Sequence, residues 1–314
     1  MNKILIIGCG SIGAAYDMEN DLVLTHAKAF YLSGQFAMFF YDINLTVSKK
    51  VAEKYNGVLI EDIHSVILAE FDIVSICTPT DSHFHYLTSC LRAKVPVIIC
   101  EKPISMNSEQ LLLLELLYNK SNSKVIVNYF RRFLTQIQEV KELYKQLVTD
   151  RGEEITNVVI KYKKGFLNNC SHAFDLIEFI TDQKILLSHF SVLQKKVDHF
   201  YNDPTIVAHG LLNKATFIIN GIYNTSLAIF EIEITTNSLV IEINRAGDSI
   251  VFYRQSNGQY IKSQVVVQYF DNVLTNNMLA VQNKACQMLN GAKTSDNFLS
   301  ALHLNRYMLK LLNH

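Results

Sequence analysis

A short apolar run that ends in a spaced set of glycines most constrains how this chain can fold. Lys3–Ile7 reads as a buried parallel strand, and Gly8-Cys9-Gly10-Ser11-Ile12-Gly13 follows it directly as G-x-G-x-x-G. Glycines at this spacing allow a tight turn, close approach of the backbone to a pyrophosphate, and close helix–strand packing. We expect a helix to open here and the turn to bind a dinucleotide through Gly8, Gly10, Ser11, Ile12 and Gly13. The alternative is a tight strand–helix turn without a ligand.

The first part of the chain alternates strand-like and helix-like segments. Apolar runs at 3–7, 37–41, 58–60, 72–77, 95–100 and 124–128 are separated by helical patterns at 25–32, 45–55, 84–93 and 108–119. Asn107 is an N-cap candidate for the last of these helices, with Gln110 in the capping-box position. This alternation predicts an α/β fold with a doubly wound parallel sheet, a Rossmann domain over residues 1–124.

The rhythm changes after about residue 125. A helix is expected at 134–147, a strand at 156–163 and a helix at 171–180, and successive strands follow from 185 to 270. Turn signals such as Asn220-Gly221 and Asn257-Gly258 separate these strands, and two helices near 275–289 and 296–312 close the sequence. Strands without intervening helices indicate a large open, mainly antiparallel sheet. We therefore predict an α+β domain over 125–314, with the last helices able to pack back on the first domain.

Asp42 follows the second predicted strand and bears on the choice of cofactor. A carboxylate there can accept hydrogen bonds from an adenosine ribose and repels a 2′-phosphate, which favours NAD over NADP. Its distance from the glycines exceeds the usual ~20 residues. The polar stretch Tyr16–Asp21 accounts for the excess as an insertion before the first helix. The alternative is an ordinary solvated aspartate in a turn.

Further polar residues follow two neighbouring strands. Thr78, Pro79 and His83 come after the fourth predicted strand, and Glu101 and Lys102 after the fifth. Ligands of open α/β sheets bind at the carboxyl ends of the strands, so these five residues are candidates for contact with the cofactor. Without further context, Glu101-Lys102-Pro103 could equally be an exposed loop.

Four elements occur here in a characteristic order: the glycine pattern, Thr78-Pro79 with His83, Val97–Pro103 with its Glu-Lys-Pro, and Asn128–Phe133. Together they resemble the glucose–fructose oxidoreductase/inositol dehydrogenase/rhizopine catabolism family, Gfo/Idh/MocA. The resemblance implies a Rossmann domain followed by an open-sheet domain that often forms the oligomer interface. It also implies that Lys102 lies near the nicotinamide and the substrate, and that Glu101 supports Lys102 or the cofactor.

The resemblance extends to a second catalytic element, which reads Asp-x-Gly-x-His in the family. Here His172 matches the histidine and Asp175 a later aspartate, while Asn168 stands in place of the first aspartate and Cys170 in place of the glycine. An asparagine can hydrogen-bond a hydroxyl but cannot act as a base, so proton transfer falls to His172 or Lys102. Asn168, Asp175, Tyr129 and Arg132 are expected to bind the substrate, Arg132 through an anionic group.

Composition limits the classes of partner. Lys+Arg and Asp+Glu both number 29, so net charge gives no reason to expect nucleic acid or a membrane surface. No apolar run approaches the ~20 residues that span a bilayer. The six cysteines form no CxxC pair and no metal-ligand spacing, which favours a reducing, cytoplasmic compartment without a metal site. Too few helices are available to cover both faces of the second sheet, so we expect a homodimer or homotetramer formed through it.

These observations predict an NAD-dependent dehydrogenase that oxidises a secondary alcohol of a sugar or nucleotide-sugar, with His172 as general base and Lys102 stabilising the alkoxide. The sequence also resembles members of this family that act in surface-polysaccharide pathways. Two alternatives remain open. The chain could use NAD transiently to cleave glycosides without net oxidation, or it could be a non-catalytic dinucleotide-binding sensor, which the loss of the aspartate at 168 favours.

Overall fold

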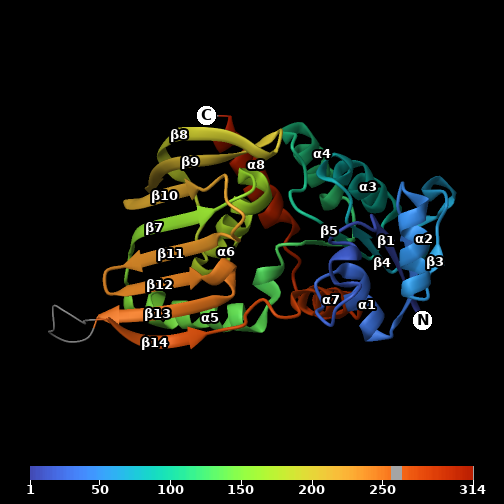
Figure 1. The fold of residues 1–314 in the computed structure, drawn as a ribbon, viewed down its shortest axis with the longest axis horizontal. Coiled ribbons are helices and arrows are strands. Elements are labelled where there is room, and N and C mark those ends of the chain that lie inside the picture. Colours follow the sequence, from blue (N-terminus) through green and yellow to red (C-terminus); the bar gives the residue numbers. More distant parts are fainter. Residues whose placement is uncertain (256–263, 314) are drawn as a thin grey trace. The chain divides into compact units, whose positions relative to one another are not determined.

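The computed structural model describes residues 1–255 and 264–313. The chain divides into two compact units (Figure 1). Unit one comprises Met1–Phe130 and Thr275–Arg306, and unit two comprises Arg131–Leu274 and Tyr307–His314. The sequence-based boundary between residues 124 and 125 stays a prediction. The expected turn at Asn257-Gly258 lies outside the described residues.

Unit one is built on a parallel sheet with the strand order β3-β2-β1-β4-β5-β6. The strands are β1 (Asn2–Ile7), β2 (Phe36–Tyr41), β3 (Val58–Leu59), β4 (Ile73–Ile76), β5 (Val97–Cys100) and β6 (Lys124–Val127). Every residue of β4 and β5 is buried, as expected for strands covered by helices on both faces. The strand order reverses between β1 and β4, which is where doubly wound sheets bind their ligands. The predicted Rossmann fold is confirmed.

The helices of this unit lie between the strands and at the end of the chain. They are α1 (His26–Ser33), α2 (Leu45–Lys54), α3 (Thr80–Ala93), α4 (Ser108–Asn119) and α7 (Asn277–Leu289), with α8 (Phe298–Leu312) beginning here and ending in unit two. Asn107 caps α4 as expected, since its side chain accepts from the backbone N–H groups of Glu109 and Gln110. Two further asparagines attach α8. Asn297 pairs with both backbone groups of Val127, and Asn305 with both of Ser105.

Unit two carries the second sheet, in the order β14-β13-β12-β11-β7-β10-β9-β8 (Figure 1). Its neighbours pair antiparallel except β7 with β10, so the predicted mainly antiparallel sheet is confirmed. The strands are β7 (Ile155–Tyr162), β8 (Leu187–Phe200), β9 (Asp203–Leu212), β10 (Ala215–Gly221), β11 (Phe230–Thr236), β12 (Leu239–Asn244), β13 (Ser249–Gln255) and β14 (Gln264–Phe270).

One face of this sheet packs against helices. The helices of the unit are α5 (Thr135–Leu147) and α6 (Ser171–Thr181). Phe174 of α6 lies on Phe217 of β10 with the ring centroids 5.5 Å apart, and both side chains are fully buried. α6 therefore covers the middle of the sheet. Within the described residues, no helix has both the length and the apolar character needed to cross a bilayer.

Candidate nucleotide and catalytic sites

The glycine turn has the geometry that a dinucleotide site needs. Gly8 adopts φ +93°, and a Cβ added there would lie 2.7 Å from the carbonyl carbon of Cys77 at the end of β4. A Cβ on Gly13 would overlap the carbonyl oxygen of Gly8. No atom comes within 4 Å of a Cβ built on Gly10, so the exposed side of the turn is open to a ligand. The residues present fit a pyrophosphate.

The helix expected at the glycine pattern is interrupted, which corrects that part of the prediction. The backbone N–H groups of His26 and Ala27 donate to the carbonyls of Ile12 and Gly13, at 3.2 and 2.9 Å. The start of α1 is therefore hydrogen-bonded to the glycine turn, and a loop is inserted between the two. The long distance in sequence between the glycines and Asp42 indicated such an insertion. Because these first N–H groups of α1 are already bonded, phosphate binding falls to the backbone of the turn itself.

The inserted loop is held by one buried carboxylate. Asp17 is fully buried, and it accepts hydrogen bonds from the backbone N–H groups of Leu24 and Thr25 and from the Thr25 hydroxyl. Thr25 in turn caps α1, because its hydroxyl accepts from the N–H of Lys28. The loop is therefore a fixed part of the nucleotide side of unit one.

Asp42 lies beside the glycine turn. One carboxylate oxygen accepts the N–H of Cys9 at 2.8 Å, and the other accepts the N–H of Asn44 at 2.8 Å. The carboxylate is partly exposed and retains acceptor capacity for a ribose hydroxyl. This placement agrees with the role expected from sequence, and contact with the ribose stays a prediction.

His83 connects the loops that follow β4 and β5. Its ring nitrogens lie 2.8 Å from the carbonyl oxygen of Pro103 and 2.7 Å from that of Thr78, and the side chain is buried. Burial lowers the pKa of His83. Thr78 also accepts a hydrogen bond from the hydroxyl of Ser82, and Pro79 is the exposed residue from which α3 starts. The structure thus assigns His83 to fixing the two loops, and its contact with the cofactor stays a prediction.

Glu101 belongs to a buried polar cluster that sequence reasoning did not identify. His26 Nε2 lies 3.0 Å from the Glu101 carboxylate, and the Asn128 amide donates to the same oxygen. Burial alone would raise the pKa of Glu101, but these two neighbours and Lys102 lower it overall. Asn128 stands in the family motif quoted above, whereas nothing in the sequence around His26 announced its partner 75 positions away. Lys102 follows Glu101 directly and is partly exposed.

In unit two, Arg132 and Asp175 bind each other. Nε of Arg132 donates to one carboxylate oxygen of Asp175 at 3.0 Å and Nη2 donates to the other, with side chains only 12% and 3% exposed. Burial raises the pKa of Asp175, and Arg132 opposes this rise. Arg132, predicted to bind an anionic group of the substrate, and Asp175, predicted to bind the substrate as well, are therefore bonded to each other. A substrate anion would have to compete with Asp175 for the guanidinium.

The segment that leads into α6 is a single π-helical turn, Phe166–Cys170. The Asp203 carboxylate at the start of β9 accepts the backbone N–H groups of Leu167 and Asn168, both at 2.7 Å. Asp203 is another residue that sequence reasoning missed. Asn168 is half-buried and His172 is 8% exposed, one turn further along. Tyr129, in unit one, is 1% exposed, so a role in substrate binding would have to act from a buried position.

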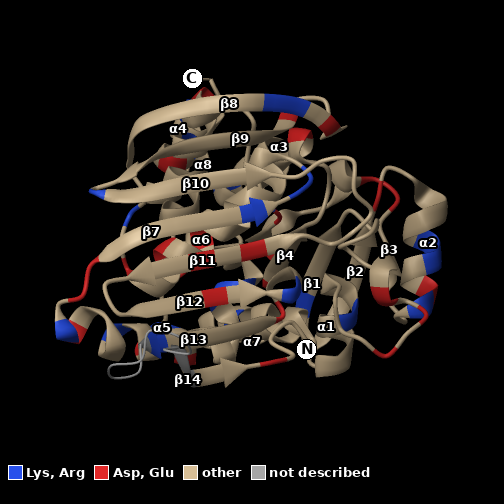
Figure 2. Cartoon of the chain, turned by 60° about the vertical axis from the view of Figure 1, so that its left-hand side comes forward, with Lys and Arg blue, Asp and Glu red and all other residues tan. Residues whose placement is uncertain are grey.

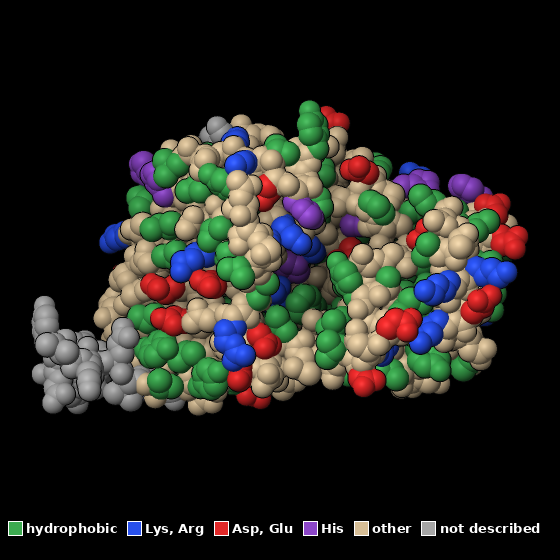
Figure 3. All heavy atoms as spheres, in the orientation of Figure 1, with side chains coloured by type: hydrophobic (Ala, Val, Ile, Leu, Met, Phe, Trp, Pro, Cys, Tyr) green, Lys and Arg blue, Asp and Glu red, His purple; other side chains and the backbone are tan. Residues whose placement is uncertain are grey.

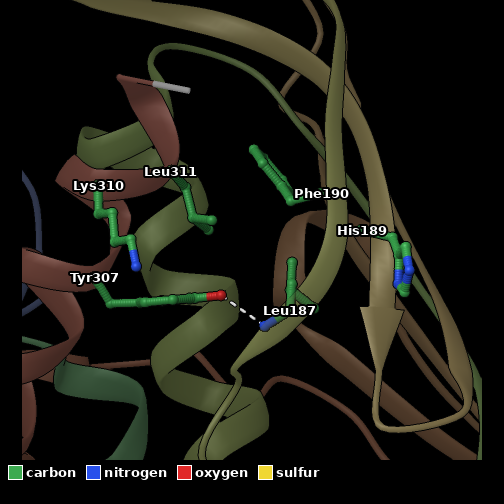
Figure 4. Close-up of a pocket in the computed structure, with 6 residues that line it drawn as sticks. All are labelled: Leu187, His189, Phe190, Tyr307, Lys310 and Leu311. Carbon is green, nitrogen blue, oxygen red and sulfur yellow. Dashed lines mark hydrogen bonds between the residues drawn. The ribbon is translucent and has the colours of Figure 1, made fainter.

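The cavity drawn in Figure 4 belongs to unit two and lies away from the predicted residues. It measures about 310 Å³ and is lined by the beginning of β8 and the end of α8, where the N–H of Leu187 donates to the Tyr307 hydroxyl. Phe190 and Leu311 add apolar walls and Lys310 a charge. None of the residues expected to be catalytic lines it. On the face shown in Figure 3, acidic and basic side chains lie interspersed.

Comparison with known proteins matches most of unit one to an NAD-binding family. Residues 2–129 match the family model described as "Oxidoreductase family, NAD-binding Rossmann fold". Inositol 2-dehydrogenase from Rhizobium meliloti is 28% identical over 37% of this chain and 38% of its own length. D-glucoside 3-dehydrogenase from Escherichia coli is 27% identical over 45% of this chain and 38% of its own length. The matched part thus spans less than half of each relative.

Two solved structures share the fold along nearly the whole chain. UDP-N-acetylglucosamine 3-dehydrogenase from Acidithiobacillus ferrooxidans has a TM-score of 0.76 at 16% identity, covering 98% of this chain and 95% of that one. The transcriptional regulator Gal80p from Kluyveromyces lactis also has a TM-score of 0.76, at 15% identity, covering 99% and 88%. The glycine turn, the strand order and the matched segment lead to one conclusion: residues 2–129 of this chain are similar to the NAD-binding Rossmann domain of the Gfo/Idh/MocA oxidoreductase family.

Proposed function

We propose that the protein is an NAD-dependent dehydrogenase that oxidises a secondary alcohol of a sugar or nucleotide-sugar. The observation that carries the proposal is the glycine turn with Asp42 bound to it, because this arrangement offers a pyrophosphate site beside a ribose acceptor. The relatives that match in sequence are named as dehydrogenases of an inositol and a glucoside, which supports a polyol or sugar substrate.

The cofactor would supply a hydride acceptor, and the protein supplies position and charge. Gly8, Gly10 and Gly13 shape the backbone that receives the pyrophosphate, while Ser11 and Ile12 contribute to the same turn. Thr78, Pro79 and Glu101, at the carboxyl ends of β4 and β5, complete the side of the site toward the nicotinamide. His83 keeps the two loops in place.

Proton transfer is assigned to two residues. His172 removes the proton of the substrate hydroxyl, as a near-neutral imidazole can. Lys102 stabilises the developing negative charge on the substrate oxygen through its ammonium group. Asn168 and Tyr129 orient hydroxyl groups through hydrogen bonds. Arg132 and Asp175 act as a pair that offers one donor side to the substrate.

A screen tests this function directly. Purified protein is incubated with NAD and a panel of polyols, sugars, glycosides and nucleotide-sugars, and NADH is followed by its absorbance. Production of NADH with a secondary alcohol supports the proposal. Cleavage of a glycosidic bond without accumulation of NADH would instead identify the glycoside-cleaving mechanism.

A regulatory protein is the second candidate, and Asn168 favours it. The amide cannot take a proton where the family places a carboxylate, and the fold is shared with the transcriptional regulator Gal80p. Tight NAD binding by calorimetry, combined with no turnover across the panel, would support this candidate over the dehydrogenase.

A further inference from the structure

Four buried side chains of unit one form a cluster in which His26 lies next to Ser75, Glu101 and Asn128. His26 begins α1, Ser75 lies in β4, Glu101 follows β5 and Asn128 follows β6. Their exposed fractions are 0%, 0%, 8% and 2%. His26 uses both ring nitrogens: Nε2 lies 3.0 Å from the Glu101 carboxylate, and Nδ1 lies 2.8 Å from the Ser75 hydroxyl. The imidazole is therefore fixed in orientation from two sides.

The cluster is arranged for an ion pair. A buried carboxylate needs a compensating charge as well as hydrogen bonds. The pKa of His26 would be lowered by burial alone, but Cys77 and Glu101 raise it overall. When both ring nitrogens carry protons, Ser75 accepts from Nδ1–H and its own hydroxyl proton points to the Cys77 sulfur, 3.5 Å away. The two N–H groups of the His26 ring and the hydroxyl hydrogen of Ser75 then each have an acceptor.

Lys102 is coupled to this pair through Glu101. The Lys102 ammonium lowers the pKa of Glu101, so the Glu101 carboxylate favours the protonated form of Lys102 in return. A positive charge on His26 neutralises the carboxylate and weakens that effect. Among the described residues of unit one, the titratable groups coupled to Lys102 include Glu101 directly, His26 through Glu101, and His83, whose pKa Lys102 lowers. Those that face His26 are Glu101 and Cys77.

We propose that His26 is a positioning residue that holds Glu101 in place and, by neutralising it, makes Lys102 a readier proton donor. In the dehydrogenase this strengthens the hydrogen bond by which Lys102 stabilises the negative charge developing on the substrate oxygen, so the inference rests on the proposed function. His26 itself touches neither cofactor nor substrate in this scheme, because its two nitrogens are committed to Glu101 and Ser75.

The test measures protonation of Lys102 without any need for turnover. Folded protein is treated briefly with acetic anhydride at a series of pH values, and acetylation of Lys102 is read by peptide mass spectrometry. In His26→Gln the amide still donates to Glu101 but carries no charge. We expect the pH at which Lys102 is half-reactive to rise by about half a unit or more. In Glu101→Gln, which removes the anion, we expect this pH to fall.

Two controls make the comparison specific. Lys124, exposed in β6, serves as an internal reference in every sample. His303→Gln changes a histidine of unit one that pairs with Glu115 on α4, so it controls for the type of substitution. Neither Lys124 in any variant nor Lys102 in His303→Gln should change its half-reactive pH. If His26→Gln does not fold, Ser75→Ala replaces it, because loss of the Nδ1 acceptor also disfavours the charged imidazole.

The outcomes separate this inference from the proposed function. An unchanged half-reactive pH of Lys102 in folded His26→Gln or Ser75→Ala overturns the inference, whether or not the protein turns over a substrate. A rise in that pH supports the charge coupling. If the rise occurs but no alcohol yields NADH in wild type, the dehydrogenase proposal fails while the coupling stands. If NADH forms, the alkaline limb of the rate profile, where the Lys102 ammonium loses its proton, should move upward in His26→Gln together with the labelling.

Discussion

The Asp42 carboxylate accepts the backbone N–H of Cys9 at 2.8 Å and so ties the end of β2 to the glycine turn. We expect this charge to lie where the 2′-phosphate of NADP would have to bind. We expect NAD to bind at least tenfold more tightly than NADP, equivalent to about 1.4 kcal/mol. Calorimetric titration of both cofactors measures the ratio. Equal or tighter binding of NADP would show that Asp42 does not contact the ribose.

Asp42→Asn provides a matched control for this preference. The amide oxygen can still accept from Cys9, so the turn should be preserved while the charge is lost. We expect NADP binding to improve and NAD binding to weaken only slightly. A variant in which both affinities fall together would indicate that Asp42 acts through the turn alone.

Catalysis should depend on Lys102 and His172 far more than cofactor binding does. Lys102→Ala and His172→Ala are each expected to lower kcat by roughly 10²–10⁴-fold, the range for lost acid–base assistance. NAD affinity should change little because the pyrophosphate binds at the glycine turn. Steady-state kinetics with the substrate from the screen, beside NAD titration, checks both statements. Wild-type rates in both variants would remove these residues from the mechanism.

Asn168 gives a graded comparison within the same assay. Asn168→Ala should lower kcat less than either catalytic substitution, because the amide only orients a hydroxyl. Asn168→Asp restores a carboxylate, but in the turn whose N–H groups are already bonded to the Asp203 carboxylate. Two negative charges in one turn repel, so we expect Asn168→Asp to remain folded with a lowered unfolding temperature. Thermal unfolding of wild type, Asn168→Ala and Asn168→Asp measures the unfolding temperatures, and the value for Asn168→Asp should be the one below wild type.

The Arg132–Asp175 pair should behave as a buried ion pair. Asp175→Ala leaves the guanidinium without its carboxylate and should lower the free energy of unfolding by about 3–5 kcal/mol. The double variant Arg132→Met, Asp175→Leu should lose much less, since no uncompensated charge stays behind. Urea unfolding of Arg132→Met, Asp175→Leu and the double variant, each beside wild type, gives the coupling energy. Additive losses would mean that the two side chains do not support each other.

The charge on His26 should make stability depend on pH. Because its pKa is raised in the folded protein, to about 10, the imidazolium contributes stability that is full below the unfolded value of about 6.5 and is lost as pH rises through the folded value. Glu101, with a lowered pKa, contributes above its unfolded value and loses this as pH falls through the folded one. The stability advantage of wild type over His26→Gln should therefore shrink from pH 6.5 to 10. A difference constant over this range in urea unfolding contradicts the ion pair.

Assembly through the second sheet remains a prediction, and the exposed face of that sheet gives it a location. A shallow cavity of about 560 Å³ on β8–β10 includes Leu193, Val207 and Ile218 in its lining, and Leu193 is 66% exposed. Figure 2 shows charged segments on β7, β8, β11 and β12 of this sheet. We expect a dimer or tetramer by light scattering at micromolar concentration, and Leu193→Lys should shift it toward monomer. A monomeric wild type would refute the prediction.

The local pattern of the sequence was enough to predict the strands of unit one and the glycine turn, but not the interruption of the helix that follows the turn. Strands buried on both faces are continuous apolar runs in the sequence. A backbone position at φ +93° requires glycine, so the turn at Gly8 is visible in the sequence as well. The alternation of these runs with amphipathic helices fixes the doubly wound topology, because parallel neighbours require crossovers. Asp42 could be placed for the same reason, since it follows its strand by one residue.

Pairings between distant residues were decided only by the tertiary structure. His26 and Glu101 are 75 positions apart, and Asn297 completes the edge of β6 from 170 positions away. The sequence predicted that Arg132 and Asp175 each bind the substrate, whereas in the structure they bind each other. A short-range pattern records what a residue prefers in its own element, whereas the partner of a buried charge depends on which elements packing brings together. The sequence by itself determined the secondary-structure elements and which polar side chains are present. The tertiary structure determined which of these side chains are bonded to each other.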